Sequence, residues 1–230
     1  TELIAPQMTP TRGENVDTHS LPLEAPLREL GAEPLVFPII RDHKAMLERA
    51  LDDALACADI VIINGGTAKG EEDFNTALIA RKGELLHHYV SAAPGRPMAA
   101  GIIGGKPVIN LPGPTMASFF GVEWCIAPMV CRALHLPAPE RQTVTCTLAE
   151  DISSNVHMAI LCRMQVVKTD KGLVAKPLSF KQRGAMPASL VSNGMYVSPV
   201  GESQRKAGEK IEVQLLRGAQ FVPQETDAAR

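Results

Sequence analysis

The sequence has few of the features that mark membrane or nucleic-acid-binding proteins. No apolar run approaches the roughly 20 residues that a membrane-spanning helix needs, and 23 basic side chains are balanced by 25 acidic ones. Nucleic-acid-binding proteins usually carry a basic face. Aromatic residues make up only 4% of the chain, which leaves little surface for stacking bases or sugars. The first ten residues do not resemble a signal peptide. These absences exclude membrane, fibrous and nucleic-acid roles.

The chain also lacks the short motifs of common metal and nucleophile sites. Its five cysteines are widely spaced and form no C-x-x-C pair, so neither a zinc ribbon nor a thioredoxin-type pair is predicted. An odd number of thiols in apolar surroundings indicates buried, reduced cysteines and therefore a cytoplasmic protein. G-x-S-x-G and Walker sequences are absent as well.

The first 136 residues alternate segments of helical and of strand-like periodicity. Apolar residues at helical spacing predict helices over 20–31, 43–58, 71–80 and 116–134. Short apolar runs predict strands over 35–40, 59–63, 85–92, 97–103 and 106–110. Alternating strands and helices indicate the α/β class, with a mostly parallel sheet that is covered on both faces.

Capping residues predict where these helices begin and end. Ser20 is placed to cap the first helix, which Gly31 would end. Asp42 is placed to cap the second helix, although the same carboxylate could instead bind a metal ion. Pro128 is expected to bend the fourth helix.

The pattern changes after a proline-bearing linker at 138–142. Short alternating strands with polar turns follow, which predicts a small all-β domain over 143–217, barrel-like if it closes. Residues 218–230 look like a frayed tail. The predicted organisation is therefore an α/β domain at 1–137, the linker, the β domain and the tail.

Two glycine-bearing loops follow predicted strands and precede predicted helices. They are NGGTAKG at 64–70 and LPGPT at 111–115. Ligands of α/β sheets bind at this edge, where backbone N–H groups face an anion. By itself a Gly-Gly turn is more often an ordinary tight turn. Asp73 could hold magnesium against a phosphate or merely face the positive end of a helix. Arg96, in the turn PGRP, could bind an oxyanion or be a solvated charge.

Together these motifs resemble the molybdopterin molybdotransferase family, which includes the E domain of gephyrin. The resemblance is carried by ADIVIINGGTAKGEEDF, GELLHHYVSAAPGRP and KPVINLPGPTMAS, in that order. They are similar to the family's GGxSxGxxD, H-x-V-x-x-x-PGKP and LPGNPxS motifs. The upstream DTHS and IIRDH are similar to its D-S-N-S and D-D motifs, and AGEKIEVQLL is similar to its C-terminal barrel.

The resemblance implies a three-layer molybdopterin-binding domain followed by a β-barrel domain. It also implies a reaction in which molybdate enters the dithiolene of adenylated molybdopterin and AMP is released, with Mg²⁺ assisting. Full-length members form homodimers and carry two N-terminal domains, and this chain starts at the family's G-D-E-L point. The expected ligand is therefore a small pterin, and the expected partner is a second copy of the full-length protein.

The resemblance also assigns roles to individual residues. Asp42, Asp73 and Arg96 would be catalytic, and Glu2 would join the two aspartates at the metal. The residues expected to contact the pterin ligand are Gly65, Gly66, Thr67, Gly70, Pro112, Gly113, Ser118 and Arg163. We expect Asp42, Asp73, Arg96 and the Gly65–Gly66 amides to converge on one pocket.

Several positions depart from the family pattern. Ala68 replaces a serine, His43 replaces the second acid of the D-D pair, and Ala93 stands where a lysine often precedes PGKP. The loop LPGPT, which ends at Thr115, lacks the Asn-Pro of the family's LPGNP motif. Ser118 lies one residue after the position at which the family has a serine. Each change removes a donor, an acceptor or a charge. A second hypothesis is therefore a non-catalytic module that binds or scaffolds molybdopterin.

Overall fold

The computed structural model describes residues 2–66, 74–178 and 191–225, which form two compact units. Unit 1 comprises the residues up to 90 and residues 95–139, and unit 2 comprises residues 91–94 and those from 140 onward. Across the described ranges, no helix combines the length and the apolar character needed to cross a membrane.

The sheet of unit 1 is mixed rather than mostly parallel. Its strands, in the order in which they pair, are β3 (Val61–Asn64), β7 (Lys106–Leu111), β6 (Ala99–Ile103) and β4 (Glu84–His88). Only β3 and β7 pair in parallel. The sequence-based expectation was wrong here because Gly104 and Gly105, with φ of 57° and 80°, form a two-residue turn between β6 and β7. Such a turn joins antiparallel strands.

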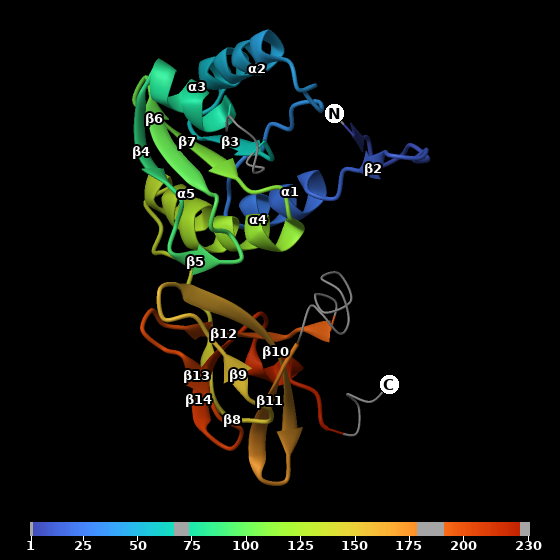
Figure 1. The fold of residues 1–230 in the computed structure, drawn as a ribbon, viewed down its shortest axis with the longest axis vertical. Coiled ribbons are helices and arrows are strands. Elements are labelled where there is room, and N and C mark those ends of the chain that lie inside the picture. Colours follow the sequence, from blue (N-terminus) through green and yellow to red (C-terminus); the bar gives the residue numbers. More distant parts are fainter. Residues whose placement is uncertain (1, 67–73, 179–190, 226–230) are drawn as a thin grey trace. The chain divides into compact units, whose positions relative to one another are not determined.

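Helices cover both faces of this sheet, which confirms the α/β class with a three-layer unit (Figure 1). The helices are α1 (Ser20–Glu29), α2 (Lys44–Cys57), α3 (Phe74–Lys82), α4 (Thr115–Gly121), the π-helical η1 (Val122–Ile126) and α5 (Ala127–Ala133). One core joins α2 and α3 to the sheet through Leu51, Leu78 and Val108. The opposite core joins α1, η1 and α5 to it through Leu27 and Ile126.

The helix boundaries follow the predictions with two local differences. Gly31, with φ of 91°, follows the end of α1 as expected. Ser20 is the first residue of α1 rather than its cap, and His43, not Asp42, directly precedes α2. The predicted helix over 116–134 is interrupted by the π-helical turn η1, and Pro128 lies in the first turn of α5 directly after it. Proline lacks the N–H that continues a helical ladder, which disturbs the preceding turn.

The strand predicted over 35–40 does not form. In the structure these residues have no regular secondary structure. Four of their apolar side chains are 36% to 55% exposed, namely Leu35, Val36, Phe37 and Ile39. A strand needs a neighbour to pair with, and no described strand lies against this segment. The N-terminal pair β1 (Leu3–Ile4) and β2 (Asn15–Val16) forms a separate parallel ladder.

Unit 2 is a closed β-barrel. The ring is β11 (Gly172–Pro177), β8 (Thr143–Leu148), β14 (Lys210–Leu215), β12 (Gly194–Ser198) and β10 (Ala159–Thr169), and it closes because β11 also pairs with β10. Short strands β5 (Ala92–Ala93), β9 (Ile152–Ser153) and β13 (Gln204–Arg205) complete the unit. The predicted all-β module and its closure are confirmed.

The segment that was predicted to be a frayed tail is partly packed on this barrel. The 3₁₀ turn η2 (Ala219–Phe221) leads to Val222, which is 6% exposed and belongs to the barrel core. The backbone N–H of Lys168 donates a 2.8 Å hydrogen bond to the carbonyl oxygen of Pro223. Two apolar residues in a polar stretch were too weak a periodic signal to predict this packing.

Candidate functional site

The two glycine-bearing loops meet because the strands that precede them are parallel neighbours. The β3–β7 register places Asn64 opposite Leu111. The backbone N–H of Gly65 donates to the carbonyl oxygen of Leu111 over 3.0 Å. The carboxyl ends of both strands therefore open at the same edge of the sheet, which is where ligands of α/β sheets bind.

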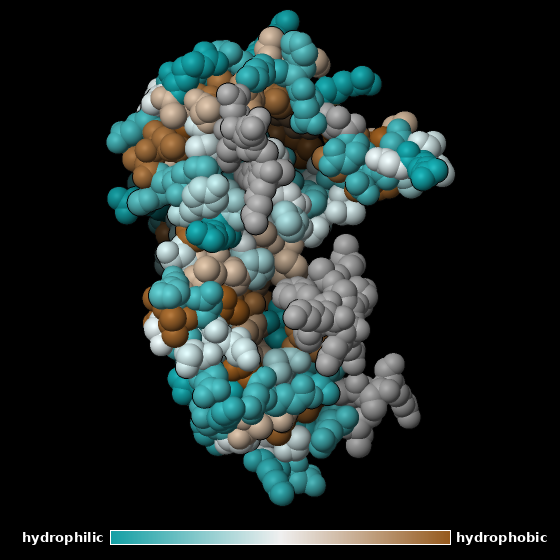
Figure 2. All heavy atoms as spheres, viewed as in Figure 1, coloured by the Kyte–Doolittle hydropathy of each residue, from teal (hydrophilic) through white to brown (hydrophobic). Residues whose placement is uncertain are grey.

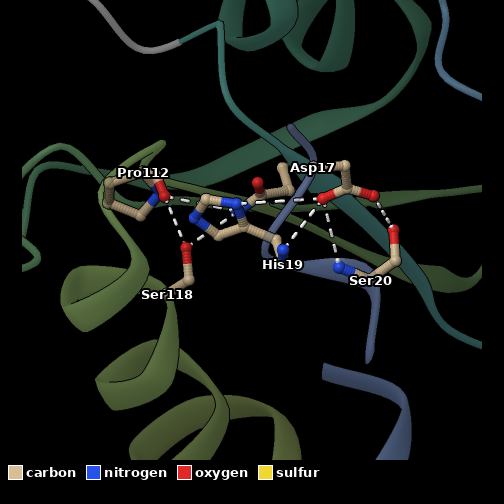
Figure 3. Close-up of polar contacts among 6 residues, drawn as sticks. Asp17, His19, Ser20, Pro112 and Ser118 are labelled. Carbon is tan, nitrogen blue, oxygen red and sulfur yellow. Dashed lines mark hydrogen bonds and ion pairs between the residues drawn. The ribbon is translucent and has the colours of Figure 1, made fainter. Parts of the chain in front are cut away.

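A hydrogen-bonded cluster joins the two loops. The Asn64 side-chain amide donates to Ser118 Oγ over 2.8 Å and to the Pro112 carbonyl oxygen over 3.3 Å. Ser118 Oγ donates to the same carbonyl oxygen over 2.6 Å. Ser118 is 1% exposed, and Figure 3 shows its hydroxyl turned toward Pro112. These contacts hold the two loops at a defined separation, with Gly113 beside Pro112.

The Gly65–Gly66 turn is held from below by Asn75 of α3. The Asn75 side-chain amide donates to the Gly65 carbonyl oxygen over 3.1 Å, and Asn75 is 5% exposed. Gly66 has φ of 68°, and a Cβ at this residue would lie 2.4 Å from Asn75 Nδ2. Both the backbone angle and the close approach require glycine at position 66. Gly66 itself is exposed.

A further buried amide lies under the cluster. Asn110 of β7 is fully buried, and Asn75 Nδ2 lies 3.5 Å from its Oδ1. Among the described residues, Asn110 Nδ2 has no hydrogen-bond partner. A buried donor without a partner is uncommon in a folded protein and carries a desolvation cost. Sequence analysis assigned no role to Asn64 or Asn110. The signal that it missed is an asparagine that follows isoleucine near the end of an apolar strand, in both VIIN and KPVINL.

The turn between β2 and α1 supplies a second wall, which sequence analysis noted only through the motif DTHS. Figure 3 shows the His19 imidazole between Asp17 and the Pro112–Ser118 loop. The distance between His19 Nδ1 and Asp17 Oδ1 is 4.0 Å. His19 Nε2 is buried, and it has no hydrogen-bond partner within the part of the chain that the structure describes. The imidazole therefore adds a polar atom beside the two loops.

Asp17 is held in its charged form. Burial alone would raise the pKa of Asp17. The hydroxyl of Ser20 and the backbone N–H groups of His19 and Ser20 all donate to the carboxylate. These hydrogen bonds outweigh burial, so the pKa of Asp17 is lowered. Asp17 thus fixes the start of α1 next to the loops.

The predicted catalytic and metal-binding residues occupy other segments. Asp42 is exposed just before α2, and Glu2 is exposed before β1. Arg96 is exposed in the turn between β5 and β6, with its guanidinium 5.8 Å from the ring centre of Tyr89. No described contact joins Glu2 or Arg96 to the Asn64 cluster. The predicted convergence of the charged groups on one pocket therefore stays a prediction.

Three predicted site residues lie outside the described residues, namely Thr67, Gly70 and Asp73. Arg163 belongs to unit 2, where it is 7% exposed on β10. Burial lowers the pKa of Arg163 to about 10. Its cationic form is therefore less favoured than in water.

The described residues do not by themselves fit a magnesium site. Within ranges 2–66, 74–178 and 191–225, no three acidic, histidine or cysteine side chains are grouped to hold a metal ion. Magnesium prefers several oxygen ligands, and Glu2 and Asp42 supply carboxylates only from separate exposed segments. The third predicted ligand, Asp73, falls in the segment that is not described.

The chain is similar to proteins of molybdenum cofactor biosynthesis. Residues 1–132 match the family model described as "Probable molybdopterin binding domain". A Methanocaldococcus jannaschii protein, named for molybdopterin biosynthesis, is 27% identical over 89% of this chain and 48% of its own length. The molybdopterin molybdenumtransferase of Staphylococcus aureus strain COL is 28% identical over 83% of this chain and 46% of its own length.

A solved structure shares the fold of nearly the whole chain. The molybdopterin biosynthesis protein MoeA of Pyrococcus horikoshii matches with a TM-score of 0.79 and 26% identity, over 94% of this chain and 52% of that one. The chain thus spans about half the length of the curated relatives that it matches.

Proposed function

The chain belongs to the molybdopterin-binding domain family of molybdenum cofactor biosynthesis, and on that premise we propose that the loops at the ends of β3 and β7 bind a phosphorylated pterin. The observation that carries the proposal is the joined pair of loops. Asn64 and Ser118 hold the two loops together, and Asn75 holds the Gly65–Gly66 turn. Glycine backbone at a strand end suits the close approach of an anionic group.

Each part of the cluster can take a separate part of the ligand. The backbone N–H groups of the Gly65–Gly66 turn would donate to phosphate oxygens. Asn64 uses its amide N–H₂ within the cluster, and no described residue hydrogen-bonds its Oδ1, which suits a donor on the pterin ring. His19 Nε2 adds a donor or an acceptor on the opposite wall. Arg96 is a cation suited to an oxyanion such as molybdate.

We further propose that the activity of the full-length relatives applies to this chain: molybdate is inserted into adenylated molybdopterin, which is the ligand of the same loops. The homology to molybdopterin molybdenumtransferases supports this proposal. Magnesium would supply electrostatic stabilisation of the phosphate if Asp73 completes a ligand set with Asp42 or Glu2. A homodimer of the full-length protein is part of the same proposal.

The second candidate is a module that binds molybdopterin without catalysis. It is favoured by one observation: the described residues build a hydrogen-bonded cradle but no group of metal-binding side chains. His43 at the second acid position and Ala93 at the lysine position reduce the charge available for catalysis. Binding is therefore the part of the function that the described geometry supports best.

Gly66→Ala tests the binding site. We expect the methyl group to displace Asn75 and to weaken binding of molybdopterin and of adenylated molybdopterin at least tenfold, which corresponds to about 1.4 kcal/mol. Fluorescence titration of the 230-residue chain measures this. The matched control is Gly172→Ala, where φ is 108° but no atom lies within 4 Å of the added Cβ. Equal affinity in both variants and the parent chain would exclude the proposed site.

A second experiment separates the enzyme from the binding module. The full-length protein is expressed in cells that lack their molybdopterin molybdotransferase, and the activity of a molybdoenzyme is measured. Rescue supports the transferase. Absence of rescue by a chain that still binds adenylated molybdopterin supports the non-catalytic module, and if neither ligand binds, both candidates fail.

A further inference from the structure

Asn110 is a fully buried polar residue in an apolar strand. It lies near the carboxyl end of β7, between Ile109 and Leu111, and all three are 2% exposed or less. Hydrophilic side chains of unit 1 gather instead at its surface, as over α2 in Figure 2. Moving an amide out of water costs free energy unless its hydrogen bonds are replaced. An apolar side chain at position 110 would avoid this cost.

The position of Asn110 is fixed on both edges of its strand. β7 lies inside the sheet, and its backbone pairs Asn110 with Ile63 of β3 and with Ala99 of β6. Val108, two residues earlier, packs into the core formed with α2 and α3. Alternate residues of a strand face the same side, so Asn110 faces α3. A side chain on a strand that is paired on both edges is a rigid support.

The contact that Asn110 makes on this face is with Asn75 of α3. The oxygen Oδ1 of Asn110 accepts a long hydrogen bond from Asn75 Nδ2, over 3.5 Å. The same Nδ2 donates to the Gly65 carbonyl oxygen over 3.1 Å. An amide nitrogen carries two hydrogens, so both hydrogens of Asn75 Nδ2 are used. The plane of the Asn75 amide is therefore set by Asn110 on one side and by Gly65 on the other.

The orientation of the Asn75 amide determines the orientation of the glycine loop. The Gly65 carbonyl and the Gly66 N–H belong to one planar peptide group, so holding the carbonyl also directs the N–H. A Cβ at Gly66 would lie 2.4 Å from Asn75 Nδ2 and 3.3 Å from its Cγ, which shows how closely the loop follows this amide. The Gly65 N–H is held separately, by the carbonyl oxygen of Leu111 over 3.0 Å. Rotation of Asn75 would therefore turn the Gly66 N–H.

The second polar atom of Asn110 is not used within the fold. Its Nδ2 is buried, and over the described ranges it has no hydrogen-bond partner. Buried donors of this kind are uncommon in folded proteins. Retention of an amide that uses only its oxygen indicates that the acceptor is the part that matters. A residue that breaks a local rule of stability is typical of a functional site.

We propose that Asn110 is a positioning residue of the glycine loop. Through Asn75 it holds the peptide between Gly65 and Gly66 in the orientation that presents the Gly66 N–H to an anion. The proposal rests on the proposed function for the identity of that anion, the phosphate of a pterin. It gives Asn110 no contact with the ligand, so its effect on the loop can be measured without ligand.

The first test measures the loop in the ligand-free 230-residue chain. Asn110→Leu keeps a branched side chain but removes the acceptor. In ¹H–¹⁵N NMR spectra we expect the signals of the Asn75 side-chain amide and the Gly66 backbone amide to shift more than amide signals of the barrel. Unchanged signals from both groups would overturn the proposal. If Asn110→Leu does not fold, Asn110→Ala removes the same acceptor and replaces it in every measurement.

The second test separates positioning from packing. Asn110→Leu is expected to weaken molybdopterin binding about tenfold in a fluorescence titration, whereas urea unfolding should show no loss of stability. The matched control is Ile109→Val, whose side chain packs into the core on the α1 side. We expect it to lower stability and to leave the affinity unchanged. Parent-like affinity of Asn110→Leu, or a joint loss of its stability and affinity, would overturn the proposal.

A conservative variant tests whether the oxygen of Asn110 is the required atom. Asn110→Asp keeps an oxygen that can accept from Asn75, and complete burial favours the neutral form of its carboxyl group. We expect its affinity for molybdopterin to stay within about threefold of that of the parent chain. Equal losses of affinity in Asn110→Asp and Asn110→Leu would contradict the role of the acceptor.

A double variant tests the route through Asn75. If Asn110 acts through that amide, Asn110→Leu has no further effect on affinity in a chain that already carries Asn75→Ala. An equal loss of affinity in both backgrounds would overturn the proposal. If the parent chain binds neither molybdopterin nor adenylated molybdopterin, the proposed function fails, and the ligand-free NMR comparison still decides whether Asn110 positions the loop.

Discussion

In unit 2 each strand of the five-stranded ring pairs with two neighbours, whereas the described sheet of unit 1 is open, with β3 and β4 as its edge strands. The barrel buries its apolar side chains, such as Val213 and Met164, completely. Unit 1 leaves the apolar residues 35–40 largely exposed and places a polar cluster at the ends of two strands. A closed sheet leaves no backbone for a partner, and an open one does.

The two units also use asparagine differently. In unit 2, Asn193 accepts from the Val166 N–H over 2.6 Å and donates to the Val166 carbonyl oxygen over 2.8 Å, so both ends of its amide serve the barrel. In unit 1, Asn64 uses only its N–H₂ group among the described residues. The comparison indicates that a polar side chain with all its bonds inside the fold is structural, and one with an unused atom is available for a ligand.

The largest effect is expected from the barrel core. Leu148→Ala removes a side chain that is 2% exposed, and we expect it to lower the free energy of unfolding by about 3 kcal/mol. Leu35→Ala, at a residue of unit 1 that is 53% exposed, should change it by about 0.5 kcal/mol or less. Urea unfolding followed by circular dichroism measures both values. Similar losses would mean that residues 35–40 are packed and that the contrast between the units is wrong.

The asparagine pair gives the next largest effect. Asn193→Ala leaves the buried backbone of Val166 without its partners and should cost about 2 kcal/mol of stability, with no change in pterin binding. Asn64→Ala should cost about 1 kcal/mol of stability but weaken molybdopterin binding about tenfold. The two measurements are a denaturant titration and a ligand titration. If Asn193→Ala were the variant that lost ligand affinity, the roles assigned to the two residues would be reversed.

The smallest effect concerns acid stability. The pKa of Asp17 is lowered in the folded state, so its contribution is complete above the unfolded pKa of about 4 and is lost as the pH falls further through the folded pKa. Asp17→Asn should therefore lower stability at pH 7 and make it less sensitive to acid below about pH 4. Asp151 of unit 2 also has a lowered pKa, owing first to its hydrogen bond with Lys206, but it is solvent-exposed. Asp151→Asn is expected to change acid stability less. A greater change for Asp151→Asn in pH-dependent unfolding would contradict this order.

Much of the fold could be predicted because its signals are local. Helical spacing predicted α1 and α2, and alternating residues with polar turns predicted the barrel strands. The loops at 64–70 and 111–115 could be predicted as a meeting point because strand ends followed by glycine are a local pattern, and the parallel β3–β7 pair bears this out for the described loop residues.

The rest depends on contacts between distant residues. Asn75 and Asn110 are 35 positions apart and meet only because α3 packs on the sheet. Figure 3 shows His19 beside the Pro112–Ser118 loop, and α1, which follows His19, contacts α4, which follows Pro112. Neither contact produces a periodic pattern in the sequence, so neither could be predicted from it. The catalytic roles of Asp42 and Arg96 were inferred from the resemblance, and these roles stay predictions.

The sequence by itself determined the helices, most of the strands, the two-part organisation and the likeness to molybdopterin-binding proteins, since periodicity and motifs are properties of neighbouring residues. Tertiary structure alone decided that the sheet is mixed, that residues 35–40 form no strand, that Val222 joins the barrel core and that Asn64, Ser118 and His19 gather at one edge. The physical reason is that a strand acquires its direction and its partner from the backbone groups beside it in space. A segment with the composition of a strand therefore stays unpaired until such a neighbour is present.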